Sequence, residues 1–208
     1  MISSRLAKTT VLNRLKSSAS RFLGPWGVFL KGFIKHPVMV GSIIPSSSFT
    51  VNKMLAPVDW DNTKLFVEYG PGIGTFCQPI LDRMRPDATL LVIDLNEDFI
   101  EYLWYNVRDS RFVAVHGSAA DVNAIINNLG FAHADYILSG LPFSTLPNNL
   151  GAVIAEETAK AIRPGGAFLV YQFRARARDF MIPHFRKIDN GYALWNILPC
   201  HLFWGWKE

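Results

Sequence analysis

Glu68-Tyr69-Gly70-Pro71-Gly72-Ile73-Gly74 is the stretch of this sequence that determines the fold. Residues 64–69 have the composition of a buried strand, and residues 76–84 after the glycines have the spacing of a helix. Glycines at such a turn let backbone N–H groups approach a ligand closely. Asp94 follows Gly74 by twenty residues, at the end of the next predicted strand, where a carboxylate can bind ribose hydroxyls. The pattern predicts a nucleotide-type ligand; the simpler alternative is a glycine turn that binds nothing.

The strand-then-helix order repeats along the chain. Further strands are expected at 89–94, 111–116, 136–139 and 167–173, and further helices at 97–107, 121–129 and 148–162. The apolar tail 187–206 can supply two more strands. This alternation predicts an α/β fold with a doubly wound, seven-stranded, mostly parallel sheet and helices on both faces. We expect this domain to occupy residues 37–208, preceded by N-terminal amphipathic helices in residues 1–36.

The glycine spacing indicates which ligand the loop would bind. Dinucleotide-binding folds use G-x-G-x-x-G and place a pyrophosphate at the helix N-terminus, whereas this loop reads E-x-G-x-G-x-G. Glu68 is poorly placed for a pyrophosphate and well placed for an ammonium group. The loop resembles motif I of the class I S-adenosylmethionine-dependent methyltransferases, a Rossmann-like superfamily, and the resemblance extends from residue 64 to the C-terminus.

That resemblance implies the residues that bind S-adenosylmethionine and its product S-adenosylhomocysteine. Gly70, Gly72 and Gly74 would line the methionine part, Glu68 would lie near its ammonium, and Asp94 would bind the ribose. Further cofactor contacts are expected from residues at the ends of neighbouring strands: Leu95, Ser118, Ala119 and Ser139.

Ser118 departs from the pattern of the superfamily. Many such enzymes have an acidic residue here, near the adenine amino group. The Ser118 hydroxyl could make a weaker contact, or Asp121 could substitute for the acid. Asp121 is also a suitable N-cap for the helix that follows, and this alternative is the simpler one.

Ser139-Gly140-Leu141-Pro142-Phe143 follows the fourth predicted strand and resembles the N-L-P-Y/F loop of enzymes that methylate amino nitrogen, including ribosomal-RNA adenine dimethyltransferases. The resemblance places this loop beside the transferred methyl group, so we expect its five residues to be catalytic. Gly140 replaces the asparagine that orients a planar base, which argues against a nucleobase substrate. The sequence ends at Glu208, without room for the additional helical domain that the RNA enzymes usually carry.

Four segments, in this order, resemble the soluble bacterial phosphatidylethanolamine N-methyltransferases and related lipid N-methyltransferases. They are Gly41-Ser42-Ile43-Ile44-Pro45-Ser46-Ser47-Ser48, Gly140-Leu141-Pro142-Phe143, Tyr171-Gln172-Phe173-Arg174 and Trp195-Asn196-Ile197-Leu198-Pro199. The resemblance implies stepwise transfer of methyl groups to the ethanolamine amine, towards phosphatidylcholine. It also implies recruitment to the membrane by a basic N-terminal amphipathic helix.

The reaction needs a route for the proton of the substrate ammonium. No His-Asp or Glu-Glu pair is evident near the expected site. We therefore expect the carbonyl oxygens of Ser139 and Gly140, together with water, to carry this proton. The rings of Phe143 and Tyr69 could stabilise the methylated cation, although Phe143 could equally serve ordinary packing.

The lipid phosphate needs hydrogen-bond donors. Tyr171 and Arg174 lie at the end of the fifth predicted strand, where open α/β sheets bind ligands, and arginine forks onto phosphate oxygens. We expect both residues to bind substrate. Ser47 is expected to close over the bound ligands, with helix capping as the alternative.

Charge is distributed unevenly along the 208 residues. Residues 1–58 carry +8 with no acidic residue, and the remainder carries −4. Apolar residues recur with helical period from Val11 to Phe33, opposite a basic face. This pattern predicts that residues 1–36 bind an anionic membrane surface; packing on the domain and a mitochondrial transit peptide are alternatives. No run of about 18 apolar residues predicts a transmembrane helix, so we expect a cytoplasmic protein associated peripherally with the inner face of the membrane.

Composition excludes several other classes of protein. Half of the residues are hydrophobic and 18% are charged, which excludes disordered, collagen-like and disulfide-scaffold chains. Cys77 and Cys200 lie far apart and lack the spacing of metal ligands, so we expect free thiols and no metal. We expect a monomer or weak oligomer, with phospholipid as substrate and no nucleic-acid partner.

Three alternative functions stay open at this stage. An ornithine-lipid N-methyltransferase would share every motif. A ribosomal-RNA adenine N6-methyltransferase would use the basic arm to bind phosphates, with salt-sensitive affinity. A non-catalytic membrane-binding protein on the same fold is the third, and the intact glycine loop and Asp94 argue against it.

Overall fold

A single sheet of seven strands organises the described part of the chain, in the order β3-β2-β1-β4-β5-β7-β6. The strands are β1 (Leu65–Tyr69), β2 (Thr89–Asp94), β3 (Phe112–His116), β4 (Ala134–Ser139), β5 (Ile162–Gln172), β6 (Lys187–Ala193) and β7 (Cys200–Trp206). The pairs among the first five strands are parallel, and β7 runs antiparallel to β5 and β6. The predicted seven-stranded, mostly parallel sheet is confirmed.

The computed structural model describes residues 47–143, 145–146, 149–172, 176–193 and 200–208. The amphipathic helices predicted in residues 1–36 therefore lie outside the described residues. So do Arg174 and the tail motif at 195–199.

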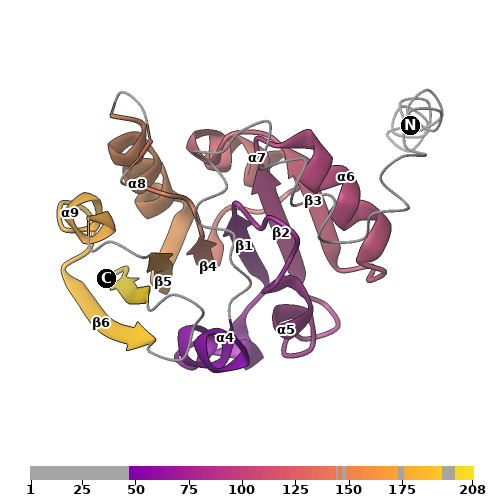
Figure 1. The fold of residues 1–208 in the computed structure, drawn as a ribbon, viewed down its shortest axis with the longest axis horizontal. Helices are drawn as coiled ribbons and strands as arrows, with labels where there is room; N and C mark the ends of the chain where they lie inside the picture. The colour runs from indigo at the N-terminus through magenta and orange to yellow at the C-terminus, as the bar shows by residue number, and fades with distance from the viewer. Residues whose placement is uncertain (1–46, 144, 147–148, 173–175, 194–199) are drawn as a thin grey trace.

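Helices cover both faces of the sheet, as predicted (Figure 1). They are α4 (Ser48–Leu55), α5 (Cys77–Leu81), α6 (Glu97–Asn106), α7 (Val122–Asn128), α8 (Leu150–Ala161) and α9 (Ala177–Met181), with 3-10 turns η3 (Trp60–Asn62) and η4 (Ala119–Asp121). Apolar side chains of α4, α5 and α6 form one core with the sheet, and those of α7, α8 and α9 form the other. Burial on both faces explains why β1 and β4 are continuous buried runs rather than alternating ones.

The structure differs from the sequence prediction at the start of β5. This strand begins at Ile162, inside the segment predicted as helix, and runs through Pro164-Gly165-Gly166. Its pairing with β4 shifts register between Ala134 and Tyr136. A Cβ at Gly166 would collide with the backbone of β4, so this glycine permits a close approach between strands rather than marking a loop. Helix α9 was not predicted because five residues are too few to give a periodic signal.

The strand order reverses between β1 and β4, which places a topological switch point at the centre of the sheet. In register, Tyr69 of β1 lies beside Ile93 of β2 and Ser139 of β4. The carboxyl ends of these three strands are therefore level with one another. Open α/β sheets bind their ligands at this edge, outside the switch point.

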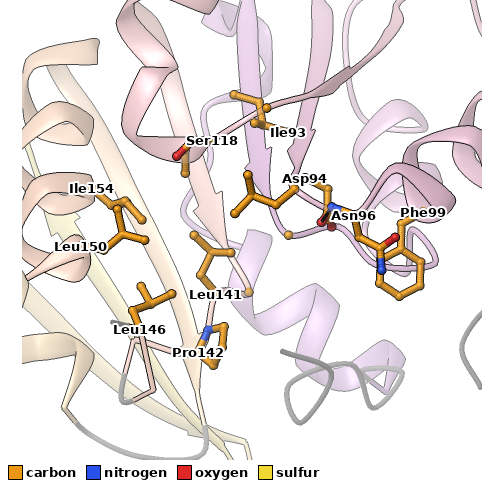
Figure 2. Close-up of a pocket in the computed structure, with 15 residues that line it drawn as sticks. Ile93, Asp94, Asn96, Phe99, Ser118, Leu141, Pro142, Leu146, Leu150 and Ile154 are labelled. Atoms are coloured by element: carbon orange, nitrogen blue, oxygen red, sulfur yellow. Dashed lines mark hydrogen bonds between the residues drawn. The ribbon is translucent and has the colours of Figure 1, made fainter. Parts of the chain in front are cut away.

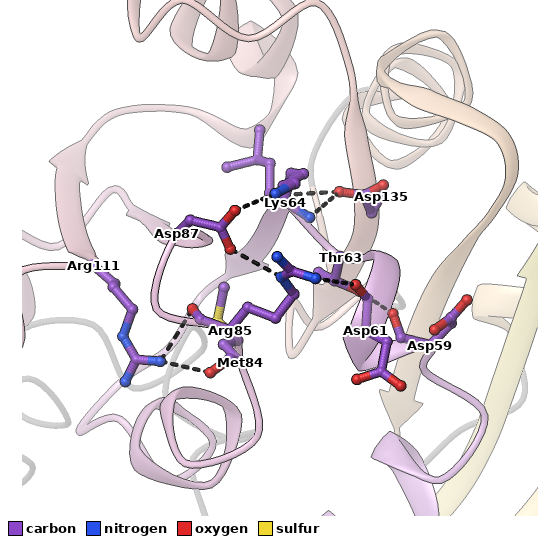
Figure 3. A network of polar contacts seen from close by, with 10 residues as sticks. Asp59, Asp61, Thr63, Lys64, Met84, Arg85, Asp87, Arg111 and Asp135 are labelled. Carbon is purple, nitrogen blue, oxygen red and sulfur yellow. Dashed lines mark hydrogen bonds and ion pairs between the residues drawn. The ribbon is translucent and has the colours of Figure 1, made fainter.

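The opposite edge of the sheet is held by a polar network that involves Asp135 (Figure 3). One oxygen of this buried carboxylate accepts from the backbone N–H groups of Lys64 and Leu65, at 2.7 and 2.9 Å. Its other oxygen contacts Arg163. The network joins the start of β1 to β4 and β5, so it fixes the far ends of the strands whose near ends form the site.

Candidate active site

The glycine loop connects β1 to α5 and turns with left-handed backbone at all three glycines. Gly70, Gly72 and Gly74 have φ values of +62°, +56° and +83°, which side chains rarely adopt. Gly70 donates its N–H to the carbonyl of Ile93 at 2.9 Å, which fastens the loop to β2. A Cβ at Gly74 would lie 2.5 Å from the Cδ2 atom of Leu103 on α6, so the helix packs directly against the loop. The glycines are therefore needed both for the turn and for this contact.

Glu68, directly before the loop, is fully buried on β1 and keeps one oxygen without a partner. Its Oε2 atom accepts from the Cys77 thiol at 3.7 Å. Its Oε1 atom has no hydrogen-bond partner among the described residues. Burial raises the pKa of Glu68 to about 8, and the charge of Asp94 adds to this effect, while the Cys77 contact opposes it. A buried carboxylate with an open oxygen suits a cationic ligand group.

Asp94 ends β2 and lies against the glycine loop. Its Oδ1 atom accepts the N–H of Asn96 at 2.8 Å. Burial raises the pKa of Asp94 to about 6, while backbone N–H groups of Asn96, Gly72 and Leu95 and the nearby His116 oppose the rise. The carboxylate is ionised at neutral pH and keeps acceptor capacity for hydroxyl groups of a ligand.

Ser118 follows β3 and faces the same cleft. Its hydroxyl accepts from the N–H of Ala120 at 3.2 Å and so caps the short helix η4. Ala119 beside it is buried, and Asp121 is exposed and makes no side-chain cap hydrogen bond with α7. The proposed substitution of Asp121 for an adenine-binding acid therefore has no support, and the predicted capping role of its side chain is also not seen.

The loop after β4 is fixed by two hydrogen bonds. The buried Ser139 hydroxyl accepts from the N–H of Leu141 at 3.2 Å. Gln172, at the end of β5, donates its side-chain amide to the carbonyl of Leu141. The loop is thus tied both to its own strand and to the next one, which holds Gly140 and Pro142 at the cleft wall.

These elements line a cleft at the switch point, which spans about 720 Å³ when its mouth in open solvent is included. Eight predicted site residues line it: Gly70, Asp94, Leu95, Ser118, Ala119, Gly140, Leu141 and Pro142. Figure 2 shows Asp94 and Asn96 on one side, and Leu146, Leu150 and Ile154 on the other, with Leu141 and Pro142 between them. The cleft therefore has a polar wall from β2 and an apolar wall from the segment around the start of α8.

The structure places Tyr69, Phe143 and Ser47 away from the cleft wall. Tyr69 is fully buried, and its hydroxyl lies 3.2 Å from that of Thr158. Phe143 packs against the rings of Phe168 and Phe180 in the core. This corrects the expectation that the two rings face a methylated cation, because Tyr69 points from β1 into the core and Phe143 packs there against other aromatic rings.

The Ser47 hydroxyl accepts from the N–H of Thr50 and caps α4, so the capping alternative describes its observed contacts. Tyr171 lies behind Gly140 rather than in the wall of the cleft. Neither residue shows a contact that would hold a phosphate. Four of the predicted cofactor-binding residues do not line the cleft: Glu68, Gly72, Gly74 and Ser139.

Sequence reasoning missed several residues that line the cleft. Asn96 caps α6 through the N–H of Asp98 at 3.0 Å, and the Asn-Glu-Asp order after Asp94 is a recognisable helix start. Leu146, Leu150 and Ile154 repeat every four residues, which is a helical stripe that the sequence alone does not distinguish from ordinary core. Their position beside the loop after β4 arises only from the tertiary structure.

Within the described ranges, no group of three or more His, Cys, Asp or Glu side chains could hold a metal ion. None of the helices in that part of the chain is long and apolar enough to span a membrane.

The observed groups fit the cofactor that motif I implies. Glu68 offers an open, buried carboxylate oxygen for an ammonium, and Asp94 offers acceptors for ribose hydroxyls. The glycine loop leaves room for a ligand to approach the backbone, and apolar side chains of the opposite wall can cover a flat ring.

A curated relative and several solved structures resemble this chain. No protein-family model matches the chain. The ornithine lipid N-methyltransferase of Singulisphaera acidiphila is 30% identical over 142 residues, which are 68% of this chain and 74% of that protein.

Two solved structures share the fold at low identity. The precorrin-6y C5,15-methyltransferase of Geobacter metallireducens matches with a TM-score of 0.61 at 10% identity, over 78% of this chain and 89% of that one. The N-methyltransferase NodS of Bradyrhizobium japonicum, in complex with S-adenosylhomocysteine, matches with a TM-score of 0.55 at 15% identity, over 76% and 83%.

Proposed function

Because this chain belongs to the lipid N-methyltransferases within the class I S-adenosylmethionine-dependent superfamily, we propose that it methylates the primary amine of a zwitterionic membrane lipid. Its methyl donor is S-adenosylmethionine. The observation that carries the proposal is the cleft at the switch point. Its wall combines the carboxylate of Asp94 with the loop after β4 that has glycine at position 140, and Glu68 directly before the glycine loop keeps a buried oxygen without a partner among the described residues.

Two head groups share the chemistry that the site would recognise. Phosphatidylethanolamine is the substrate implied by the motif set that includes Gly140-Leu141-Pro142-Phe143. Ornithine lipid is the substrate named for the 30% identical relative. Both pair an anionic group with a flexible primary alkyl amine. The proposal therefore specifies the amine and its anionic neighbour, with up to three methyl groups added in steps.

S-adenosylmethionine supplies a methyl group that is already activated on a sulfonium. The chain must then hold a neutral amine in line with that methyl and keep water away from it. Asp94 would bind the ribose and Glu68 the amino-acid ammonium. The apolar wall that contains Leu150 and Ile154 would exclude water from the cleft.

The proton that leaves the substrate ammonium needs an acceptor. An alkyl ammonium resembles lysine, whose pKa is about 10.4, so the free amine is scarce at neutral pH. We propose that the carbonyl oxygens of Ser139 and Gly140 accept hydrogen bonds from the amine and orient it, and that water carries the released proton to the solvent. Arg174, outside the described residues, is the proposed partner of the anionic group.

The basic segment 1–36 would bring this cleft to the bilayer. Its +7 charge without acidic residues favours anionic lipid surfaces. Residues 37–208 would then form the catalytic domain, associated peripherally with the cytoplasmic face of the membrane. The structural description begins at residue 47, so the proposal rests here on charge and periodicity.

The test offers full-length protein a choice of substrates. Radiolabelled S-adenosylmethionine is added with anionic vesicles that contain phosphatidylethanolamine, ornithine lipid or neither, and lipid extracts are separated by chromatography. We expect label in at least one amine lipid and none in the vesicles without one. A separate reaction with ribosomal RNA covers the nucleobase alternative. Label in RNA alone, or no label from protein that binds S-adenosylhomocysteine, would overturn the proposal.

A further inference from the structure

The hydroxyl of Tyr171 occupies the space that a side chain at Gly140 would need, directly behind the wall of the cleft. Gly140 lines the cleft at the end of β4, and Tyr171 lies near the end of the neighbouring strand β5. A Cβ at Gly140 would overlap the hydroxyl of Tyr171 and would lie 2.9 Å from its Cζ atom. The same Cβ would be 3.3 Å from the carbonyl oxygen of Gly70. The tyrosine hydroxyl therefore stands where a side chain at position 140 would begin, at the junction of the β1 and β4 loops.

The position of the Tyr171 hydroxyl is fixed by packing. Its ring lies 4.9 Å from that of Phe76, centroid to centroid, and Phe76 is fully buried. Burial raises the pKa of Tyr171 far above its usual value, and the nearby Glu68 carboxylate and the thiols of Cys200 and Cys77 act in the same direction. The hydroxyl stays protonated and neutral at any pH at which the protein would work.

A comparison with Tyr69 separates a structural hydroxyl from one that is available to a ligand. Both tyrosines lie at the carboxyl ends of strands, but Tyr69 is fully buried whereas Tyr171 is only partly buried. Tyr69 points into the other core and pairs with Thr158 at 3.2 Å. The Tyr171 hydroxyl instead adjoins Gly140, which lines the cleft.

We propose that Tyr171 is a specificity-determining residue, whose hydroxyl oxygen accepts an N–H of the substrate amine beside Gly140. The inference rests on the proposed function and adds the residue that recognises the amine. Position 140, directly after β4, has no side chain. The hydroxyl of Tyr171 on β5 occupies the place where one would begin. The absence of a Cβ at Gly140 leaves its place to the Tyr171 hydroxyl, and from there the hydroxyl would orient the lone pair of the amine towards the methyl group.

The chemistry of successive methylation gives this role a distinctive signature. A neutral primary amine has two N–H groups, a monomethylated amine has one, and a dimethylated amine has none. A hydroxyl that accepts an N–H can therefore orient the first two transfers, and it cannot orient the third in this way. A structural role for the same hydroxyl would affect all three transfers alike.

The test measures kcat/KM of wild type, Tyr171→Phe and Tyr69→Phe on the unmethylated, monomethylated and dimethylated forms of the lipid. For Tyr171→Phe we expect about a tenfold loss on the unmethylated lipid, in keeping with one hydrogen bond. We expect less than about a twofold change on the dimethylated lipid, in S-adenosylhomocysteine affinity and in Tm. Tyr69→Phe should lower Tm and leave the ratio of the three substrates unchanged.

A second arm tests the shared space directly. Gly140→Ala should lower activity and Tm in wild type, because the Cβ and the hydroxyl cannot both fit. In the Tyr171→Phe background the Tm penalty of the same change should be smaller, since the closest atom has been removed. Equal penalties in both backgrounds would contradict the geometry.

The outcomes separate this inference from the proposed function. If wild type methylates no amine lipid, the proposed function fails. If wild type is active and Tyr171→Phe retains full kcat/KM on the unmethylated lipid, the inference alone fails. It also fails if Tyr171→Phe slows every substrate equally or weakens cofactor binding by the same factor. If wild type does not use the dimethylated lipid, the inference is tested by two effects of Tyr171→Phe. It requires a loss of kcat/KM on the unmethylated lipid together with unchanged affinity for S-adenosylhomocysteine.

Discussion

Glu68 and Asp94 show how two carboxyl groups in one site acquire different pKa values. Both are carboxylates next to the glycine loop, and burial raises both pKa values, to about 8 and about 6. Asp94 receives backbone N–H groups that favour its charged form, whereas one oxygen of Glu68 has no partner in the described structure. Asp94 is therefore prepared for hydroxyl donors, and Glu68 gains most from a ligand that brings positive charge.

The first prediction concerns Asp94. Replacing Asp94 with alanine removes the charged acceptor at the end of β2, so affinity for S-adenosylhomocysteine should fall about tenfold or more. Asp121→Ala is the matched control, because this exposed carboxylate lies outside the cleft wall. Titration calorimetry on both variants decides. Unchanged affinity in Asp94→Ala would remove its assignment to the ribose.

The second prediction concerns the pH dependence of Glu68. Its pKa rises from 4.5 to about 8 in the folded protein without ligand. The stability linked to this proton is present below about pH 4.5 and is lost as pH rises through about 8. A ligand ammonium pairs with the ionised form, so binding of S-adenosylhomocysteine should tighten several-fold between about pH 7 and about pH 8.

Glu68→Gln supplies the control for that experiment. The variant keeps the shape of the side chain and cannot ionise, so its affinity should be weaker and should lack this pH dependence. Asp94 is already ionised in this range, because the pKa of its carboxyl is about 6. Parallel pH profiles in wild type and variant would show that Glu68 does not bind the ammonium.

The residues of the site differ in how far the sequence alone could predict them. Asp94 and the glycine loop were predictable because strand, turn and acid follow one another locally. The pairing of Gly140 with Tyr171 was not, because the two positions meet only when β4 and β5 lie side by side. Tyr69 was misassigned for the opposite reason, since proximity in sequence to the glycines says nothing about which face of the strand it occupies.

At the scale of elements, the turn between β1 and α5 has little tolerance for side chains at its glycines. Its last glycine carries two constraints, a positive φ and the contact with α6. The order of strands and helices was predictable from periodicity, whereas the start of β5 was not. There Gly166 serves a close strand approach that a one-dimensional pattern reads as a loop.

The third prediction separates these two constraints. Gly74→Ala adds a Cβ 2.5 Å from Leu103 at a φ of +83°, whereas Gly130→Ala adds one in open space at a φ of +87°. Gly130→Ala should cost about 1–2 kcal/mol from backbone strain alone. Gly74→Ala should cost more and should also weaken cofactor binding. Denaturant unfolding of both variants checks this, and equal losses would show that the contact with α6 is unimportant.

At the scale of the whole molecule, the two edges of the sheet have different tasks. The carboxyl edge leaves carboxylates open for ligands, while the amino edge closes its polar groups on one another (Figure 3). Stability and function should therefore be separable by mutation. The sequence could not predict this division, because Asp135 and the N–H groups that it accepts are about seventy residues apart.

The fourth prediction tests that separation at Asp135. Asp135→Ala leaves two backbone N–H groups and Arg163 without their acceptor, so the free energy of unfolding should fall by about 2–4 kcal/mol. Affinity of the folded protein for S-adenosylhomocysteine should be unchanged. Asp87→Ala, which breaks exposed ion pairs with Lys64 and Arg85, should have a small effect on stability. A large loss of cofactor affinity in Asp135→Ala would contradict the division.

The central claim is that this chain transfers methyl groups to a membrane-lipid amine. The most direct measurement is mass spectrometry of lipids extracted after full-length wild-type protein and Asp94→Ala react with S-adenosylmethionine on anionic vesicles that contain both amine lipids. We expect wild type to make an amine lipid heavier by one to three methyl groups, and Asp94→Ala to make far less product. An unchanged lipid mass with wild-type protein that binds the cofactor and the vesicles would contradict it.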